Sequence, residues 1–340
     1  MEIETGQTPH ESPPGREPVS LIMTIYNERG SVERFFQDVA RFTRLPDEIV
    51  IVDGGSNDGT VEIVKARIPD CPVPVNFIEE HRCNIPRGRN LAVQHARHDL
   101  IAITDMGCIV AEDWLERILA PFEADASVDV VGGYYEPIRT LPIQDCYHYL
   151  TYKPRLEKSH FLPSSRSLVI RRRVFDAVGG YPEYISTAED TLFDLRIRER
   201  GFNEVFAPEA KVYWEIKTSC VQFFVQYYRY ARGAGRALIQ PRLYGFYMAN
   251  YTLFLCWTII ALTSFPVAWI ILAAHLAAYS YYRVFRKPLA RSHLSPGNLA
   301  RYAGITAAID LGHILGYWAG LGERILGIDE RWKPARDKNR

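Results

Sequence analysis

The sequence predicts an α/β protein with a doubly wound, mostly parallel sheet, followed by apolar helices in its last third. Short apolar runs alternate with amphipathic helical patterns over the first half of the chain, as in units of strand, helix and parallel strand. Two of these runs end abruptly at an acid, Asp53 and Asp105. Much later the chain contains 40 consecutive residues without a formal charge, Leu243–Tyr282.

The composition excludes several classes of protein. Across 340 residues, 40 basic and 40 acidic side chains give a formal net charge of zero, so no global field attracts nucleic acid. The six cysteines include no CxxC pair and no short spacing typical of a metal site, which predicts free thiols in a reducing compartment. Residues 1–18 are polar and proline-rich and lack an apolar signal core, which predicts a disordered cytosolic tail.

The predicted elements follow one another in order from Val19. Val19–Thr24 is apolar and forms the first predicted strand. Ser31 suits the N-cap of a helix to about Thr43, whose apolar residues share one face. The next predicted elements are strands at 49–52, 75–78 and 100–104 and helices at about 60–67, 91–97 and 114–122. Beyond them the sequence predicts strands at 128–135, 167–170, 205–206 and 211–213, and short helices that begin near 171 and 189.

The segment Asp47–Thr60 is the most informative stretch of this half. Ile49–Val52 is a continuous apolar run, typical of a strand buried on both faces. It ends at Asp53, and a glycine-rich turn precedes the next helix. The carboxyl ends of such strands bind ligands in open α/β sheets, and Asp105 would lie on the same edge as Asp53. By itself the segment is equally typical of an ordinary turn between a strand and a helix.

The last third predicts membrane association. Residues 216–243 combine aromatic side chains with arginines, which suits an amphipathic segment at a membrane surface. The uncharged stretch is about twice the roughly 20 residues that span a bilayer, and Ser264-Phe265-Pro266 predicts a turn between helices at about Gly245–Ser264 and Val267–Tyr282. The basic loop that follows is cytosolic by the positive-inside rule, as the region before the hairpin must be.

Tyr302–Gly322 is a second, less apolar membrane candidate that also contains Asp310 and His313. A full span there would place the basic tail outside the cell, so a re-entrant or interfacial helix is the alternative. Small residues recur every four positions and form a ridge for close contact between helices: Gly304, Ala308, Gly312, Gly316 and Gly320. The expected regions are a tail (1–18), a catalytic domain (19–215), an interfacial segment (216–243), two or three membrane helices (244–322) and a basic tail (323–340).

Six motifs occur in one order along the chain: Tyr26-Asn27-Glu28, Asp53 with its Gly-Gly-Ser-Asn-Asp-Gly-Thr continuation, Arg87-Gly88-Arg89-Asn90, Asp105, Glu189-Asp190 and Gln226-Tyr227-Tyr228-Arg229-Tyr230. In this order they resemble the family 2 glycosyltransferases of the GT-A fold, and the resemblance covers about Val19–Arg236. The apolar last third resembles that of the membrane-anchored members. The resemblance implies an enzyme that uses a nucleotide-diphosphate sugar and inverts the anomeric carbon.

The resemblance assigns the first motifs to the nucleotide sugar. It implies that Asp53 accepts hydrogen bonds from the base or ribose. Thr24, Tyr26 and Glu28, at the end of the first strand, are placed for the same nucleotide, although Tyr26 and Glu28 would also serve as turn or helix-cap residues. Arg89, at a helix start, offers a planar fork of donors to phosphate oxygens.

Asp105 matches the first acid of the family's Asp-x-Asp motif, and Gly107 stands where the second acid is expected. A divalent cation that bridges the diphosphate would neutralise the leaving group, so the resemblance implies Mg²⁺ or Mn²⁺ with Asp105 as a ligand. With one carboxylate in place of two, the diphosphate or another residue must supply further ligands. The sequence therefore favours a metal without requiring one.

Asp190 is the predicted catalytic base, because attack by an acceptor hydroxyl needs a proton acceptor within hydrogen-bond range. Glu189 is expected to orient the site or a loop and is grouped with the residues at the acceptor or diphosphate; alternatively, both acids only favour the N-terminus of a helix. Gln226 and Arg229, on one helical face, match the family's Gln-x-x-Arg-Trp except that Tyr230 replaces tryptophan. By resemblance they contact the diphosphate or the acceptor.

The sequence thus predicts a multi-pass glycosyltransferase of the cell membrane with a cytosolic catalytic domain. It would transfer a sugar to a lipid-linked or surface-glycan acceptor in polysaccharide or glycolipid biosynthesis. A sugar nucleotidyltransferase is one alternative, but it needs a glycine-rich, lysine-bearing loop after the first strand, which residues 26–28 do not form. A catalytically inactive nucleotide-sugar binder is another, motivated by Gly107; Asp190, Gln226 and Arg229 argue against it.

Overall fold

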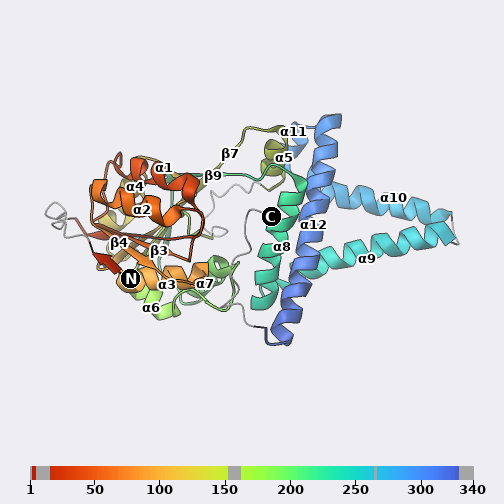
Figure 1. Cartoon of the computed structure of the whole chain (residues 1–340). Helices are drawn as coiled ribbons and strands as arrows, with labels where there is room; N and C mark the ends of the chain where they lie inside the picture. The colour runs from red at the N-terminus through yellow and green to blue at the C-terminus, as the bar shows by residue number, and fades with distance from the viewer. Residues whose placement is uncertain (1, 5–15, 152–161, 264–265, 329–340) are drawn as a thin grey trace. The chain divides into compact units, whose positions relative to one another are not determined.

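The computed structural model describes residues 2–4, 16–151, 162–263 and 266–328 (Figure 1). These residues form two compact units. The first comes from Met1–Ile138 and Arg155–Glu215, and the second from Arg139–Pro154 and Ile216–Ile328. The sequence-based scheme did not place the segment that begins at residue 139 with the helical unit.

The first unit is built on one nine-stranded sheet with the order β1-β4-β3-β2-β5-β8-β7-β9-β6. Strands β4, β3, β2 and β5 are parallel to one another, whereas β1 and β8 run antiparallel to their neighbours β4 and β5. The prediction of a mostly parallel sheet is therefore confirmed. The strands are β1 (Glu2–Glu4), β2 (Val19–Ile25), β3 (Glu48–Asp53), β4 (Val75–Glu79), β5 (Leu100–Ile103), β6 (Ile109–Val110), β7 (Val130–Ile138), β8 (Leu168–Arg171) and β9 (Glu204–Glu215).

Helices cover both faces of this sheet, as a doubly wound fold requires (Figure 1). One hydrophobic core contains Phe35 and Trp114 from the helices of one face, and the other contains Ala92 and Phe193 from the helices of the opposite face. Trp114 is fully buried, and its indole nitrogen donates to Oγ of Ser167 at 2.8 Å. The helices are α1 (Arg29–Val39), α2 (Thr60–Arg67), the short 3₁₀ turn η1 (Ile68–Asp70), α3 (Ile85–His95), α4 (Trp114–Ala124), α6 (Arg172–Val178) and α7 (Glu189–Glu199).

Helix α3 begins six residues earlier than the sequence predicts. Pro86 and Gly88 suggested a loop up to residue 90, but a proline is tolerated in the first turn of a helix, and Asn84 caps α3 by accepting a hydrogen bond from the backbone N–H of Arg87 at 3.0 Å. Position 88 of this helix needs a glycine, because a Cβ atom there would overlap Oγ1 of Thr24 on β2. Arg89 therefore lies inside α3, and its position is fixed by the close packing of α3 on β2.

Three smaller differences concern the strands and the termini. Strand β9 is one strand of 12 residues, with a register shift against β7 between Gly133 and Tyr134, where the sequence predicts two short strands. Glu2–Glu4 pairs with β4, so the expected disorder of residues 1–18 is wrong for this segment. Most of the predicted basic tail, residues 329–340, and Ser264 and Phe265 of the predicted turn lie outside the described residues.

The second unit is helical. Helices α9 and α10 form an antiparallel pair close to the predicted ranges, and α10 continues into a π-helical turn, η3 (Figure 1). Within the described ranges, α9 is the single helix long and apolar enough to cross a membrane by length and composition. The helices are α5 (Pro142–Thr151), α8 (Cys220–Ala237), α9 (Pro241–Thr263), α10 (Val267–Ser280), η3 (Tyr281–Phe285), α11 (Pro288–Ser292) and α12 (Pro296–Ile325).

Helices α8 and α12 pack with their backbones in close contact. A Cβ atom added at Gly316 or Gly320 of α12 would overlap the carbonyl oxygen of Tyr228 or Arg232 on α8, and one at Gly312 would lie 2.8 Å from the carbonyl oxygen of Phe224. The predicted ridge of small residues is confirmed at these three glycines. Tyr302–Gly322 therefore belongs to a helix of 30 residues whose glycine face is covered by protein.

Gly316→Ala is expected to destabilise the protein by about 1–3 kcal/mol or more, because α8 and α12 must separate to admit the methyl group. Gly322→Ala is the matched control: it lies on the same helix, and nothing lies within 4 Å of an added Cβ. Alanine there should stabilise by about 0.4–1 kcal/mol through the unfolded state. Thermal unfolding in detergent measures both changes, and a Gly316→Ala protein as stable as the control would contradict the packing.

Candidate active site

The candidate site lies at the carboxyl ends of β2, β3 and β5. Strand β2 pairs in parallel with both neighbours, so the segments that follow Ile25, Asp53 and Ile103 leave the same edge of the sheet. The loop after β2 carries Tyr26 and Glu28, and the loop after β5 carries Asp105. This edge is where open α/β sheets bind ligands.

Asp53 is 1% exposed, and its carboxylate organises the turn that follows it. Oδ2 accepts hydrogen bonds from the backbone N–H groups of Gly55 at 2.8 Å and Ser56 at 2.9 Å, and Oδ1 accepts one from the Ser56 hydroxyl. The structure thus gives Asp53 the turn-forming role that the sequence left open as an alternative. A contact with the nucleotide stays a prediction.

The loops after β2 and β3 are joined by hydrogen bonds. The backbone N–H of Asn27, a residue with φ of 53°, donates to Oγ of Ser56 at 2.8 Å, and that of Asn57 donates to Oδ1 of Asn27 at 2.9 Å. The backbone N–H of Glu28 donates to Oγ1 of Thr60 at 2.9 Å. Tyr26 and Glu28 are therefore presented by one rigid double loop, and their roles toward a nucleotide stay predictions.

Arg89 joins Asp105, predicted to lie at the donor, to Glu189, predicted to lie at the acceptor or diphosphate. It is 5% exposed, one terminal nitrogen donates to Oδ1 of Asp105 at 3.0 Å, and the other donates to Oε1 of Glu189 at 2.9 Å. The guanidinium also lies over the ring of Tyr181, 5.3 Å from its centroid. Burial disfavours the charge, but Asp105 and Glu189 raise the pKa of Arg89 above its ordinary value. Both terminal nitrogens thus hold carboxylates, whereas the sequence predicted that they would face phosphate.

Glu189 and Asp190 begin α7 but have different surroundings. Glu189 is 6% exposed, and burial together with the charge of Asp190 raises its pKa to about 7, although Arg89 opposes this shift. Asp190 is half-buried, and its Oδ1 accepts a hydrogen bond from the backbone N–H of Thr191 at 2.7 Å. The more accessible of the two carboxylates is the one predicted to be the base.

The sequence analysis missed two ionisable side chains near this cluster. Asp194, one helical turn after Asp190, is 2% exposed, and neither of its carboxylate oxygens has a hydrogen-bond partner among the described residues. Burial raises the pKa of Asp194 well above its ordinary value. The sequence did contain a signal for this buried acid: Asp194 lies between Phe193 and Ile197, on the buried side of a helix. Arg166 is the second, and its Nε lies 3.8 Å from Oδ2 of Asp105.

The residues around Asp105 fit a divalent cation only in part. No group of three or more histidine, cysteine, aspartate or glutamate side chains that could hold a metal occurs in the described part of the chain. The carboxylate of Glu28 lies beside Gly107, because a Cβ atom added there would be 3.6 Å from Glu28 Oε2. Glu28 therefore brings a carboxylate to the position where the second acid was expected, and a bound diphosphate would have to supply further oxygen ligands.

Gln226 and Arg229 lie on α8 in the second unit. Nε2 of Gln226 donates to the hydroxyl of Tyr230 at 3.0 Å, so the tyrosine that replaces the expected tryptophan holds the glutamine side chain. Arg229 is exposed. The predicted contacts of both residues with diphosphate or acceptor stay predictions.

Comparisons with known proteins give the family. The model described as glycosyl transferase family 2 matches residues 20–180, and the one described as glycosyl transferase family group 2 matches residues 123–282. The chain belongs to the family 2 glycosyltransferases. This glycosyltransferase is 26% identical to glycosyltransferase AglE of Haloferax volcanii over 56% of this chain and 64% of that protein. It is 23% identical to the succinoglycan biosynthesis protein ExoA of Rhizobium meliloti over 65% of this chain and 70% of the relative.

A solved structure shows the same GT-A fold. It is that of the mannosyltransferase PcManGT from Pyrobaculum calidifontis, in complex with GDP-Man and Mn²⁺. The TM-score is 0.57 at 19% sequence identity, and the likeness covers 95% of this chain and 92% of the other. The predicted α/β fold of the GT-A type is therefore confirmed, whereas the membrane hairpin stays a prediction.

The buried position of Glu189 predicts a pH dependence of stability. Its folded pKa of about 7 lies above the ordinary value of 4.5, so between these pH values the folded protein holds a proton that the unfolded chain has released. The free energy of unfolding should therefore fall as the pH rises from about 4.5 to 7, and the fall should be smaller in Glu189→Gln.

Chemical denaturation at several pH values measures this slope. Glu199→Gln, at the exposed opposite end of α7, is the matched control and should keep the wild-type slope. Part of the fall should remain in Glu189→Gln, because Asp194 acts with the same sign. Equal slopes in wild type and Glu189→Gln would rule out the buried, proton-holding glutamate.

Proposed function

We propose that this family 2 glycosyltransferase transfers a sugar, with inversion, from a nucleotide-diphosphate sugar to a lipid-linked or surface-glycan acceptor. The observation that carries the proposal is the Arg89 bridge. It links Asp105, the predicted donor-side acid, to Glu189, which is adjacent to the predicted base Asp190. A donor acid and an acceptor base held at one sheet edge are what a single displacement needs.

In the proposed reaction, Asp190 takes the proton of the acceptor hydroxyl as its oxygen attacks the anomeric carbon. The bond between that carbon and the diphosphate oxygen breaks on the opposite side, and the nucleoside diphosphate leaves with the electron pair. Tyr26 and Asp53 bind the nucleoside end of the donor, and Glu28 lies on the side of the diphosphate. Glu189 positions the first turn of α7 through its ion pair with Arg89.

We propose that Asp105 and Glu28 hold a divalent cation, Mg²⁺ or Mn²⁺, together with the donor. The cation would supply positive charge that stabilises the departing diphosphate. The Mn²⁺ of the mannosyltransferase from Pyrobaculum calidifontis supports a metal in a chain of the same fold. The family does not favour a nucleotidyltransferase or an inactive binder.

We further propose that the second unit anchors the enzyme to the cell membrane, with α9 and α10 inserted as a hairpin and the catalytic unit in the cytosol. The hairpin exposes large apolar side chains, with Leu255 at 61%, Leu262 at 70% and Ile270 at 69%. The two acids of Ile216–Ile328, Asp310 and Glu323, are both paired with arginines of the same unit. The remaining formal charges of Ile216–Ile328 are basic, which suits the anionic cytosolic face of a bilayer.

Asp190→Asn is expected to lower sugar transfer by roughly 10²–10⁴-fold, because an amide cannot accept the acceptor's proton. Donor binding should stay near the wild-type value, since the base touches the acceptor and not the nucleotide. Transfer of radiolabelled sugar and calorimetry of donor binding measure the two effects. Asp176→Asn, an exposed aspartate on α6, is the control and should leave transfer unchanged. Turnover of Asp190→Asn within a few-fold of wild type would refute the assignment.

Leu255→Lys with Ile271→Lys should release the protein from membranes, because each lysine near the middle of an inserted helix costs about 2.5–3.5 kcal/mol. The wild type should resist extraction by alkaline carbonate and by high salt, since burial of apolar surface is not screened by ions. Leu299→Lys, at a 47% exposed position near the start of α12, is the control and should stay membrane-bound. Wild-type protein that washes off in high salt would contradict the inserted hairpin.

A further inference from the structure

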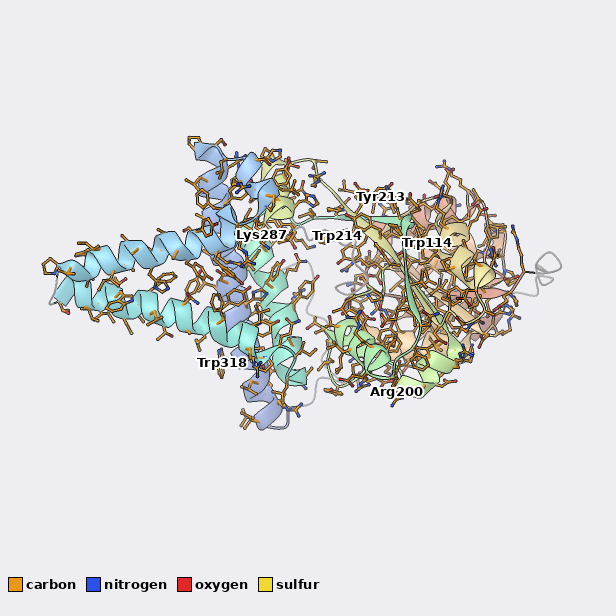
Figure 2. All side chains as sticks on the ribbon, turned by 180° about the vertical axis from the view of Figure 1, so that it is seen from behind. Trp114, Arg200, Tyr213, Trp214, Lys287 and Trp318 are labelled. Atoms are coloured by element: carbon orange, nitrogen blue, oxygen red, sulfur yellow. The ribbon has the colours of Figure 1, made fainter. Side chains whose placement is uncertain are left out.

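Arg166 precedes β8 and lies next to the donor-side acid. Its Nε is 3.8 Å from Oδ2 of Asp105, a distance too long for a hydrogen bond. The guanidinium carbon lies 5.8 Å from the ring centroid of Tyr135 on β7 and 5.3 Å from that of Trp214 on β9. Figure 2 labels Trp214 beside Tyr213 on this strand. Two aromatic rings thus pack against a cation close to Asp105.

The surroundings of Arg166 differ from those of Arg89, the other arginine at Asp105. Arg89 is 6% exposed in its side chain and has a carboxylate on each terminal nitrogen, whereas the Arg166 side chain is 28% exposed. One terminal nitrogen of Arg166 donates to Oγ of Ser164 at 3.2 Å, and its carbonyl oxygen accepts from Oγ1 of Thr104 at 2.8 Å. The side chain of Thr104, directly after β5, therefore fixes the backbone from which the Arg166 side chain starts.

Asp105 lies between two cationic side chains. Two guanidinium groups flank the single carboxylate of Asp105, one at 3.0 Å and one at 3.8 Å. A guanidinium packed over aromatic rings keeps its charge and loses less side-chain freedom when it binds an anion, and its fork of donors matches phosphate oxygens. The anion expected beside Asp105 is the diphosphate of the donor.

We propose that Arg166 binds the diphosphate of the nucleotide-sugar donor, in the role that the sequence analysis gave to Arg89. This inference rests on the proposed use of a nucleotide-diphosphate sugar. Tyr135 and Trp214 act as positioning residues that orient the guanidinium. The ligand class is a diphosphate ester, and inorganic pyrophosphate carries the same recognition chemistry.

The test is calorimetric titration of the full-length protein in detergent with EDTA, so that metal plays no part. The probes are inorganic pyrophosphate, GDP, UDP and the nucleosides guanosine and uridine. Arg166→Gln should weaken binding of pyrophosphate and of the preferred nucleoside diphosphate by about 10- to 100-fold, as loss of a charge-assisted contact does. Affinity for the nucleoside should not change.

Arg166→Lys keeps the charge without the planar fork and should weaken binding of pyrophosphate by less than Arg166→Gln. If the glutamine variant is unstable, the lysine variant alone tests the phosphate contact. Arg173→Gln is the matched control, because Arg173 is 59% exposed and pairs with Asp129. It should bind every probe as wild type does.

Three outcomes would overturn the inference. Wild-type affinity for pyrophosphate in both Arg166 variants would exclude a phosphate contact and leave the proposed function standing. An equal loss for nucleoside and nucleoside diphosphate would assign Arg166 to the shape of the nucleoside site. A wild-type protein that binds no nucleoside diphosphate of any of the common bases, either in EDTA or with Mn²⁺, would overturn the proposed donor class, and this inference with it.

Discussion

The buried bridge from Asp105 through Arg89 to Glu189 is the interaction on which the site depends. The Arg89 guanidinium is 5% exposed and keeps its charge, so it needs the two carboxylates that accept its hydrogen bonds. Removal of one partner from such a buried pair costs about 3–5 kcal/mol, so each residue fixes the other two. Because Gly88 packs closely on Thr24, the bridge starts from a helix that cannot slide along the sheet.

The second unit has a comparable constraint. Asp310 is fully buried in α12, accepts a hydrogen bond from the Tyr279 hydroxyl at 2.6 Å and pairs with Arg283 of the π-helical turn at 2.6 Å. This pair ties the end of α10 to α12, and the glycines of α12 tie it to the backbone of α8. The helix that carries Gln226 and the base of the apolar hairpin are therefore parts of one packed body.

The elements of the sheet could be predicted because a strand buried on both faces is a continuous apolar run, as Ile49–Val52 is. The partners of Arg89 could not, since Glu189 lies 100 residues away along the chain and no local pattern encodes the pair. Pro86 and Gly88 locally favour a loop, but Asn84 caps α3 ahead of them and Gly88 packs on Thr24, so both belong to the helix. Arg166 gave no periodic signal, because its surroundings come from β7, β9 and the loop after β5.

The electrostatics of Asp105 would couple a bound divalent cation to the donor. A divalent cation that approached Asp105 alone would meet a carboxylate already flanked by Arg89 and Arg166, and repulsion from two guanidinium groups would weaken its binding. A diphosphate adds negative charge between the same groups and turns that repulsion into attraction. We therefore expect cation and donor to bind cooperatively at this edge, so that a chain with Gly107 in place of a second acid depends on the donor to complete its metal site.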